Sequence, residues 1–156
     1  MVAYINPLKI YNMCYSTFPA IIYTMTGVSV TGDGDKRLKP FRRRLACKGI
    51  YERYIQGVRW EDTQYYHWRK KGKYGTIKDY DGFFKALDWM YEDMKTNGYN
   101  ENPEPWEWND YNPNHIGVGI TRDGEYVWLH DGQHRLMMAQ LLNIPKVPVR
   151  VIVIWQ

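Results

Sequence analysis

Residues 116 to 154 constrain the fold most, because their pattern changes from strand to helix and back within a short stretch. Two apolar runs, residues 116–120 and 125–129, flank an Asp123-Gly124 pair, which predicts a β-hairpin. Apolar residues then recur at helical spacing from Gln133 to Leu142, with Asn143 as the expected stop, and residues 147–154 return to strand character. The order strand, glycine turn, helix, strand predicts an α/β chain.

The length and composition favour a single domain that spans residues 1–156. The 156 residues are enough for one continuous core, and 44% hydrophobic with 24% charged residues is typical of a globular protein. The formal net charge of +4 favours phosphorylated or polyanionic partners only slightly, because such a surplus is common in proteins that bind no nucleic acid.

The cysteines, the N-terminus and the length of the apolar runs indicate the cellular compartment. Cys14 and Cys47 stand far apart, which fits neither a disulfide framework nor a zinc site and indicates a reducing compartment. The N-terminus lacks the features of a signal peptide, and no apolar run approaches the roughly 20 residues of a membrane span. We therefore expect a cytoplasmic protein without a membrane partner.

Upstream of residue 116, the periodicity predicts three helices and two irregular segments. Residues 20–30 are expected to be extended, and residues 32–35 to form a turn. A first helix is expected from Pro40 to Gly57, a second from Asp62 or Thr63 to Gly72, and a third from Tyr80 or Asp81 to Asn97. Residues 100–114, rich in Pro, Asn, Glu and Trp, are expected to form a loop over a pocket or partner.

The segment Asp131 to Arg135 carries the clearest chemical signal. A helix that begins directly after a strand exposes backbone N–H groups and the positive end of its dipole, which together favour an anion. Gly132 permits close backbone approach, and Arg135 offers a planar fork that suits phosphate oxygens. His134 adds a donor that is neutral or charged near pH 7. Asp131 has two readings: it caps the helix, or it holds a divalent cation or acts as a base.

This segment resembles the signature of the ParB/sulfiredoxin superfamily. The resemblance is carried by Asp131-Gly132-Gln133-His134-Arg135-Leu136, Ala139, Leu142, Ile144 and Val147-Pro148-Val149, and it is strong over residues 118–153. A weaker likeness to archaeal and viral members of unknown function extends upstream, through residues 32–35, 60–63 and 98–99. The resemblance implies a ParB/sulfiredoxin-like fold of the α/β (α+β) class, a small mixed sheet with packed helices.

The resemblance also implies a ligand. In that superfamily the turn binds nucleotide phosphates: sulfiredoxins use ATP, ParB proteins use CTP, and free serine kinases with a similar motif use ADP. By position, Gly132, Gln133, His134 and Arg135 would bind the phosphate. Gln133 replaces the catalytic cysteine of sulfiredoxins, which argues against sulfinate reduction, and no helix-turn-helix follows the last expected strand, which argues against chromosome partitioning. The motif is most similar to the kinase-like Asp-Gly-x-His-Arg.

Two further carboxylates are candidates for catalysis. Asp33 and Asp35, between glycines, are able to present oxygens to a metal bound to phosphates. The alternative is an ordinary turn with bonds from side chain to backbone. The leading hypothesis is a Mg-dependent phosphotransferase or nucleotide hydrolase in which Asp131, with Asp33 or Asp35, binds the metal or serves as base.

The rival hypothesis is a non-catalytic module that binds nucleic acid, as part of a viral or mobile-element assembly. Its candidate contacts are two basic runs near Tyr65, Tyr66 and Trp68: Arg42, Arg43 and Arg44, and Arg69, Lys70, Lys71 and Lys73. Charge runs of this kind are more often solvated helix faces. Salt dependence of binding separates the two hypotheses.

Overall fold

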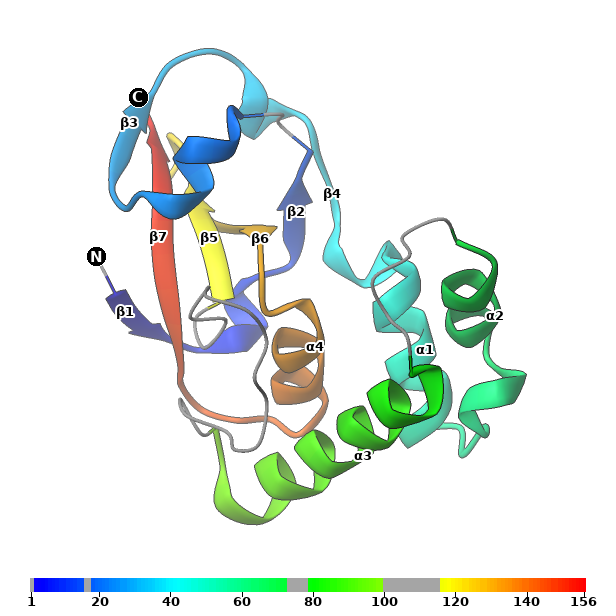
Figure 1. The fold of residues 1–156 in the computed structure, drawn as a ribbon. Helices are drawn as coiled ribbons and strands as arrows, with labels where there is room; N and C mark the ends of the chain where they lie inside the picture. The colour runs from blue at the N-terminus through cyan, green and yellow to red at the C-terminus, as the bar shows by residue number, and fades with distance from the viewer. Residues whose placement is uncertain (1, 16–17, 73–78, 100–115) are drawn as a thin grey trace.

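The chain folds around one mixed β-sheet, as seen in a computed structural model that describes residues 2–15, 18–72, 79–99 and 116–156. The strand order is β1-β7-β5-β6-β2-β4, and β3 also pairs with β7 (Figure 1). The strands are β1 (Val2–Ile5), β2 (Asn12–Cys14), β3 (Val28–Val30), β4 (Leu38–Pro40), β5 (Ile116–Ile120), β6 (Tyr126–His130) and β7 (Val147–Trp155). The α/β fold class with a mixed sheet is confirmed.

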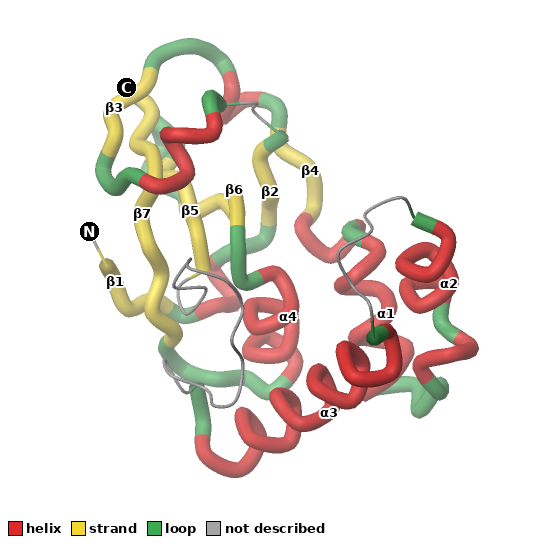
Figure 2. Tube along the Cα trace, viewed as in Figure 1, coloured by secondary structure: helices red, strands yellow, loops and turns green. Residues whose placement is uncertain are grey.

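The described residues contain four α-helices, of which α4 packs on the sheet. They are α1 (Leu45–Tyr54), α2 (Gln64–Lys71), α3 (Tyr80–Asn97) and α4 (Gln133–Leu141). Figures 1 and 2 show α4 between the sheet and α1 and α3, with α2 on the outer side of α1. This position explains why six consecutive residues of α4, from Arg135 to Gln140, are buried. The start of α4 is therefore enclosed by elements on both sides.

The sheet pairing joins segments that are distant in sequence. β5 and β6 form the expected antiparallel hairpin, whereas β5 runs parallel to β7 and β2 runs parallel to β6. β7 carries apolar residues on both faces, interrupted by Arg150, and is buried at seven of its nine positions, as is usual for a central strand. The crossover from β6 to β7 passes through α4, so the helix packs directly against the sheet.

Local signals set the ends of two helices as the sequence predicts. The Thr63 side chain accepts a hydrogen bond from the amide of Tyr66 and caps α2, which ends at Gly72. The Asp79 side chain caps α3 in the same way, and Gly98, with φ of 77°, ends that helix. The expected bounds of the second and third helices are thus confirmed.

Two upstream expectations are wrong. Pro40 does not begin a helix, because it is the last residue of β4 and lies opposite Asn12 of β2; α1 starts only at Leu45, after a 3₁₀ turn at Phe41–Arg43. Residues Ala20–Thr24 form a 3₁₀ helix instead of an extended segment, and only Val28–Val30 joins the sheet. The loop expected at residues 100–114 lies outside the described residues.

The described helices also bear on membrane association. None of them is both long enough and apolar enough to cross a lipid bilayer.

Candidate anion-binding site

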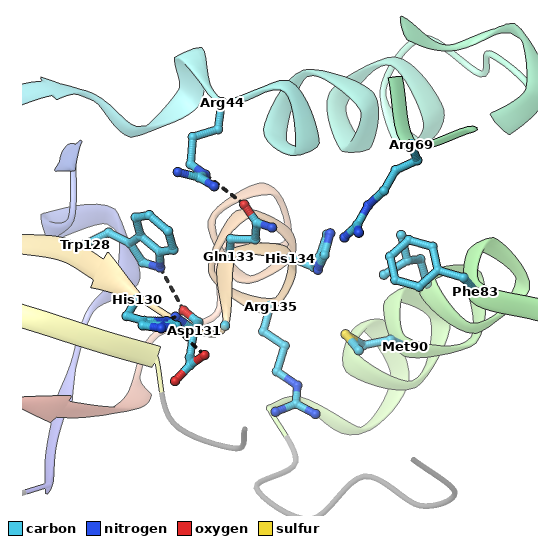
Figure 3. Close-up of a pocket in the computed structure, with 12 residues that line it drawn as sticks. Arg44, Arg69, Phe83, Met90, Trp128, His130, Asp131, Gln133, His134 and Arg135 are labelled. Carbon is cyan, nitrogen blue, oxygen red and sulfur yellow. Dashed lines mark hydrogen bonds and ion pairs between the residues drawn. The ribbon is translucent and has the colours of Figure 1, made fainter. Parts of the chain in front are cut away.

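A cavity of about 350 Å³ opens beside the first turn of α4. Its wall combines cations, an acid, polar groups and an apolar face from α3 (Figure 3). It is lined by Arg44, Arg69, Phe83, Leu87, Met90, Trp128, His130, Asp131, Gly132, Gln133, His134 and Arg135. All five residues of the segment from Asp131 to Arg135 therefore face one cavity.

The backbone makes a sharp turn before α4. Asp131 and Gly132 both have left-handed conformations, with φ of 50° and 65°, and Gly132 is the N-cap residue. A Cβ atom on Gly132 would lie 2.9 Å from the Ile116 side chain, so glycine is required by packing against β5 as well as by φ. The sequence predicts that this glycine lets a ligand approach the backbone; in the structure the missing side chain also makes room for Ile116.

The turn leaves backbone donors at the start of the helix. The first intrahelical bond runs from the amide of Leu136 to the carbonyl of Gly132, so the amides of Gln133 and His134 have no acceptor within the helix. Gly132 has no side chain with which to cap them. These amides and the helix dipole favour an anion at this point.

Asp131 does not cap α4, so that reading of the residue is wrong. Its Oδ2 lies 3.4 Å from a guanidinium nitrogen of Arg150, and its Oδ1 lies 3.1 Å from Nδ1 of His130. The indole N–H of Trp128 donates to the Asp131 carbonyl at 2.8 Å and holds the turn in place. The carboxylate thus lines the cavity with Arg150 and His130 as neighbours, and 25% of its side chain is exposed.

Two arginines from other helices converge on the same turn (Figure 3). Arg44, the N-cap residue of α1, donates from Nε to Oε1 of Gln133 at 2.7 Å, and its guanidinium lies 4.3 Å from the Trp128 ring. The guanidinium of Arg69, on α2, lies 4.8 Å from the Phe83 ring, and its Nε donates to the Tyr65 hydroxyl at 3.0 Å. Such stacking and bonding hold each guanidinium in a fixed direction.

His134 lies among these cations. Its Nε2 is 2.8 Å from the Tyr65 hydroxyl. Loss of solvation, followed by the charges of Arg69, Arg44 and Arg135, lowers the pKa of His134 to about 3. The sequence leaves open whether this histidine is neutral or charged near pH 7. With so low a pKa, its imidazole is neutral at that pH.

Arg135 takes a different direction from the other two arginines. Arg135 is only 6% exposed and lines the cavity, but in Figure 3 its side chain points away from Arg44 and Arg69. The cavity therefore has cationic groups on more than one side.

Asp33 and Asp35 do not join Asp131, so the three carboxylates form no shared metal or catalytic site. Both oxygens of Asp35 accept 2.8 Å bonds from the side chain of Arg122, which lies in the β5–β6 turn. Asp131 follows the opposite end of β6, about 16 Å away at ~3.3 Å per residue. Across the described part of the chain, no three His, Cys, Asp or Glu side chains gather as metal ligands.

The carboxylates at the Gly32–Asp35 segment have a structural role instead. The bidentate contact with Arg122 lowers the pKa of Asp35 to about 2. Arg122 also donates to the carbonyl of Gly32. Asp33 is exposed and pairs with Lys36, 2.9 Å away, and this contact lowers its pKa. These bonds fasten the segment to the hairpin turn.

The residues of the two basic runs are divided between the cavity and the exposed surface. Arg42 donates to the buried Gln140 side chain, and Arg44 and Arg69 turn into the cavity. Arg42 is nevertheless exposed, as are Arg43, Lys70 and Lys71. Lys73 lies outside the described residues.

Sequence reasoning missed Tyr65 and Arg150 as parts of the site. Tyr65 and Arg69 are four positions apart on the expected second helix. Helical side chains at this spacing contact each other, so the sequence does contain a signal for this pair. Arg150 reaches Asp131 from β7, which is separated in the sheet from β6 by β5, and no local pattern relates these two residues.

The cavity as a whole suits an anion with an apolar portion. Three arginines and one aspartate line it, together with the amides of α4, opposite Phe83, Leu87 and Met90 of α3. Comparison of the chain with protein-family models, with curated proteins and with solved structures finds no match.

Proposed function

We propose that this protein binds a nucleotide, with the phosphates at the start of α4 and the nucleoside against α3. The observation that carries the proposal is the convergence of Arg44 and Arg69 on a helix N-terminus within one cavity. A guanidinium fork and unpaired amides are the donors that phosphate oxygens require. The motif's resemblance to the ParB/sulfiredoxin superfamily supports the same ligand class, and membership in that superfamily is part of the proposal.

The apolar wall supports a ligand larger than inorganic phosphate. Phe83, Leu87 and Met90 lie on one face of α3, and the cavity of about 350 Å³ falls within the usual range of small-molecule sites, roughly 300–1,000 Å³. A base or sugar placed there buries apolar surface while its phosphates stay at α4. ATP, ADP and CTP are the nucleotides to test first.

We further propose that the bound nucleotide carries Mg²⁺ and that the chemistry is phosphoryl transfer or nucleotide hydrolysis. Magnesium is usually held by one or two carboxylates together with the substrate's own phosphates. Asp131 supplies such a carboxylate in the cavity, with Arg150 beside it. Bound Mg²⁺ would neutralise charge on the phosphates, and Asp131 would orient it or accept a proton.

Isothermal titration and thermal shift measurements with ATP, ADP and CTP, each with and without Mg²⁺, test the proposal. We expect one nucleotide to stabilise the protein, by about 2.7 kcal/mol at 100 times its dissociation constant. Substituting Arg44→Gln together with Arg69→Gln should weaken that binding at least tenfold, because two cations of the phosphate site are lost. Phosphate release assays then show whether the bound nucleotide turns over.

The exposed basic residues give a matched control. Arg43→Gln with Lys70→Gln also removes two positive charges, one from each basic run, but at residues that do not line the cavity. Nucleotide affinity should be unchanged in this control. Equal losses in both double variants, with steep salt dependence and tight binding of single-stranded DNA, would instead favour the nucleic-acid module.

A further inference from the structure

The hydroxyl of Tyr65 stands between a cation and an imidazole. Arg69 Nε lies 3.0 Å from the Tyr65 oxygen on one side, and His134 Nε2 lies 2.8 Å from it on the other. Tyr65 is 1% exposed, and its ring packs against Phe84 and His134, so water does not compete freely for the hydroxyl. The three groups form one short chain of hydrogen bonds.

The direction of each bond follows from the donors present. A guanidinium can only donate, so the Tyr65 oxygen accepts from Arg69. The tyrosine keeps its own proton at neutral pH, because burial raises its pKa above the usual value. That proton has one described acceptor within reach, the Nε2 atom of His134. Nε2 must then be the unprotonated nitrogen of the ring.

A ring whose Nε2 accepts a hydrogen bond carries its proton on Nδ1 when it is neutral. Cations face the imidazole from three helices, Arg44 from α1, Arg69 from α2 and Arg135 from α4, and these charges oppose a second proton. Nδ1 has no hydrogen-bond partner among the described residues, and His134 lines the cavity. The Nδ1–H group is therefore free to donate to a ligand.

We propose that Tyr65 is a positioning residue that holds His134 as the neutral Nδ1–H tautomer, so that the imidazole presents a donor to an oxyanion in the cavity. The identity of the ligand in this inference rests on the proposed function, whereas the tautomer of His134 does not depend on it. A neutral donor differs from the neighbouring arginines because it adds a directed hydrogen bond to an oxyanion without adding charge. Tyr65 thereby acts through His134.

Long-range ¹H–¹⁵N correlation spectra of the histidine rings in the whole chain, without ligand at pH 7, test the tautomer directly. His134→Gln identifies the His134 signals by their disappearance. We expect Nε2 to resonate as an unprotonated nitrogen and Nδ1 as a protonated one. The opposite pattern, or that of an imidazolium, would overturn the proposal without any variant at Tyr65.

Tyr65→Phe then tests the cause. This variant removes the hydroxyl and keeps the buried ring, and we expect Nε2 of His134 to move toward the position of a protonated nitrogen. Tyr66→Phe is the matched control, because Tyr66 neighbours Tyr65 on α2 and its ring also packs on Phe84. An unchanged His134 tautomer in Tyr65→Phe would refute the role of Tyr65, whereas a shift in Tyr65→Phe alone supports it.

Titration with inorganic phosphate separates this inference from the proposed function. We expect the Nδ1–H proton of His134 to shift on phosphate binding, and Tyr65→Phe to weaken that binding several-fold. If His134 has the Nδ1–H tautomer but neither phosphate nor nucleotide binds, the positioning role stands and the proposed function fails. If phosphate binds beside an Nε2–H tautomer, the proposed function stands and the positioning role fails.

Discussion

The Nε group of Arg44 donates a 2.7 Å hydrogen bond to Oε1 of Gln133, joining the start of α1 to the first turn of α4. With its oxygen accepting from Arg44, the side chain of Gln133 has its NH₂ group left to donate into the cavity. Gln133 thus contributes a donor to the first turn of α4.

Gln133→Glu should weaken nucleotide binding by roughly tenfold to a hundredfold. The new carboxylate keeps the contact with Arg44 but repels the ligand's phosphates, at about 3 kcal/mol for charges ~6 Å apart at an effective dielectric constant of ~20. Isothermal titration measures the loss. Gln64→Glu, at an exposed position on α2, makes the same change in net charge outside the cavity lining and should leave affinity unchanged.

Gly132→Ala should destabilise the fold by about 2–4 kcal/mol. The alanine would adopt a left-handed conformation, at roughly 1–2 kcal/mol, and its Cβ would also crowd Ile116. Gly124→Ala is the matched control, because φ there is also positive, 83°, but nothing lies within 4 Å of the added atom. Urea denaturation should show about 1 kcal/mol for the control; equal losses in both variants would contradict the packing argument.

Asp35→Asn should lower stability by about 1–2 kcal/mol and leave nucleotide affinity unchanged. The substitution removes a charge from a carboxylate whose side chain is 2% exposed and which is paired with an arginine that is 33% exposed, so solvent screening moderates the loss. Asp33→Asn, at an exposed carboxylate, should change the denaturation midpoint little. A variant at Asp35 that folds normally but loses nucleotide binding would revive the metal-ligand role.

His134 should make folding stability depend on pH. Its folded pKa of about 3 lies below the unfolded value of about 6.5, so the unfolded chain binds the extra proton first as pH falls. Stability is full above pH ~6.5 and is lost toward pH ~3, by at most about 1.4 kcal/mol per pH unit.

Comparison with His134→Gln isolates this effect. The wild-type protein should lose stability faster than the variant between about pH 6.5 and 4.5, a range above the acid titration of Asp35, whose pKa is about 2. Denaturation curves at several pH values provide the measurement. If both proteins lose stability equally over this pH range, His134 takes up its proton at the same pH in the folded and unfolded states, and the low folded pKa is wrong.

The sequence predicts those parts of the fold that depend on neighbouring residues. Capping by Thr63, the glycine after α3 and the Asp-Gly turn of the hairpin each act within a few positions, so the expected helix bounds match the structure and the second hairpin strand is displaced by one residue. Pro40 shows the limit. Its ring suits the start of a helix, but pairing of β4 with β2 outweighs this preference.

The candidate site likewise has a part that the sequence predicts and a part that depends on tertiary packing. The Asp131 to Arg135 turn is visible as a local motif, and the structure places it on the cavity. The sequence indicates Arg44 and Arg69 only as members of charge runs, because their convergence depends on how α1 packs against α4 and α2 packs against α1. The pairing of Asp35 with Arg122 spans 87 positions, and no local pattern indicates it.

The place of β7 in the sheet has a consequence for synthesis. β7 is hydrogen bonded to β1, β3 and β5, all of which precede it in the chain. These strands leave the ribosome before their common partner and meanwhile expose unpaired backbone edges that are prone to aggregate. The nascent chain can complete its sheet only when the last strand arrives, so a chaperone that shields strand edges should raise the yield of native protein.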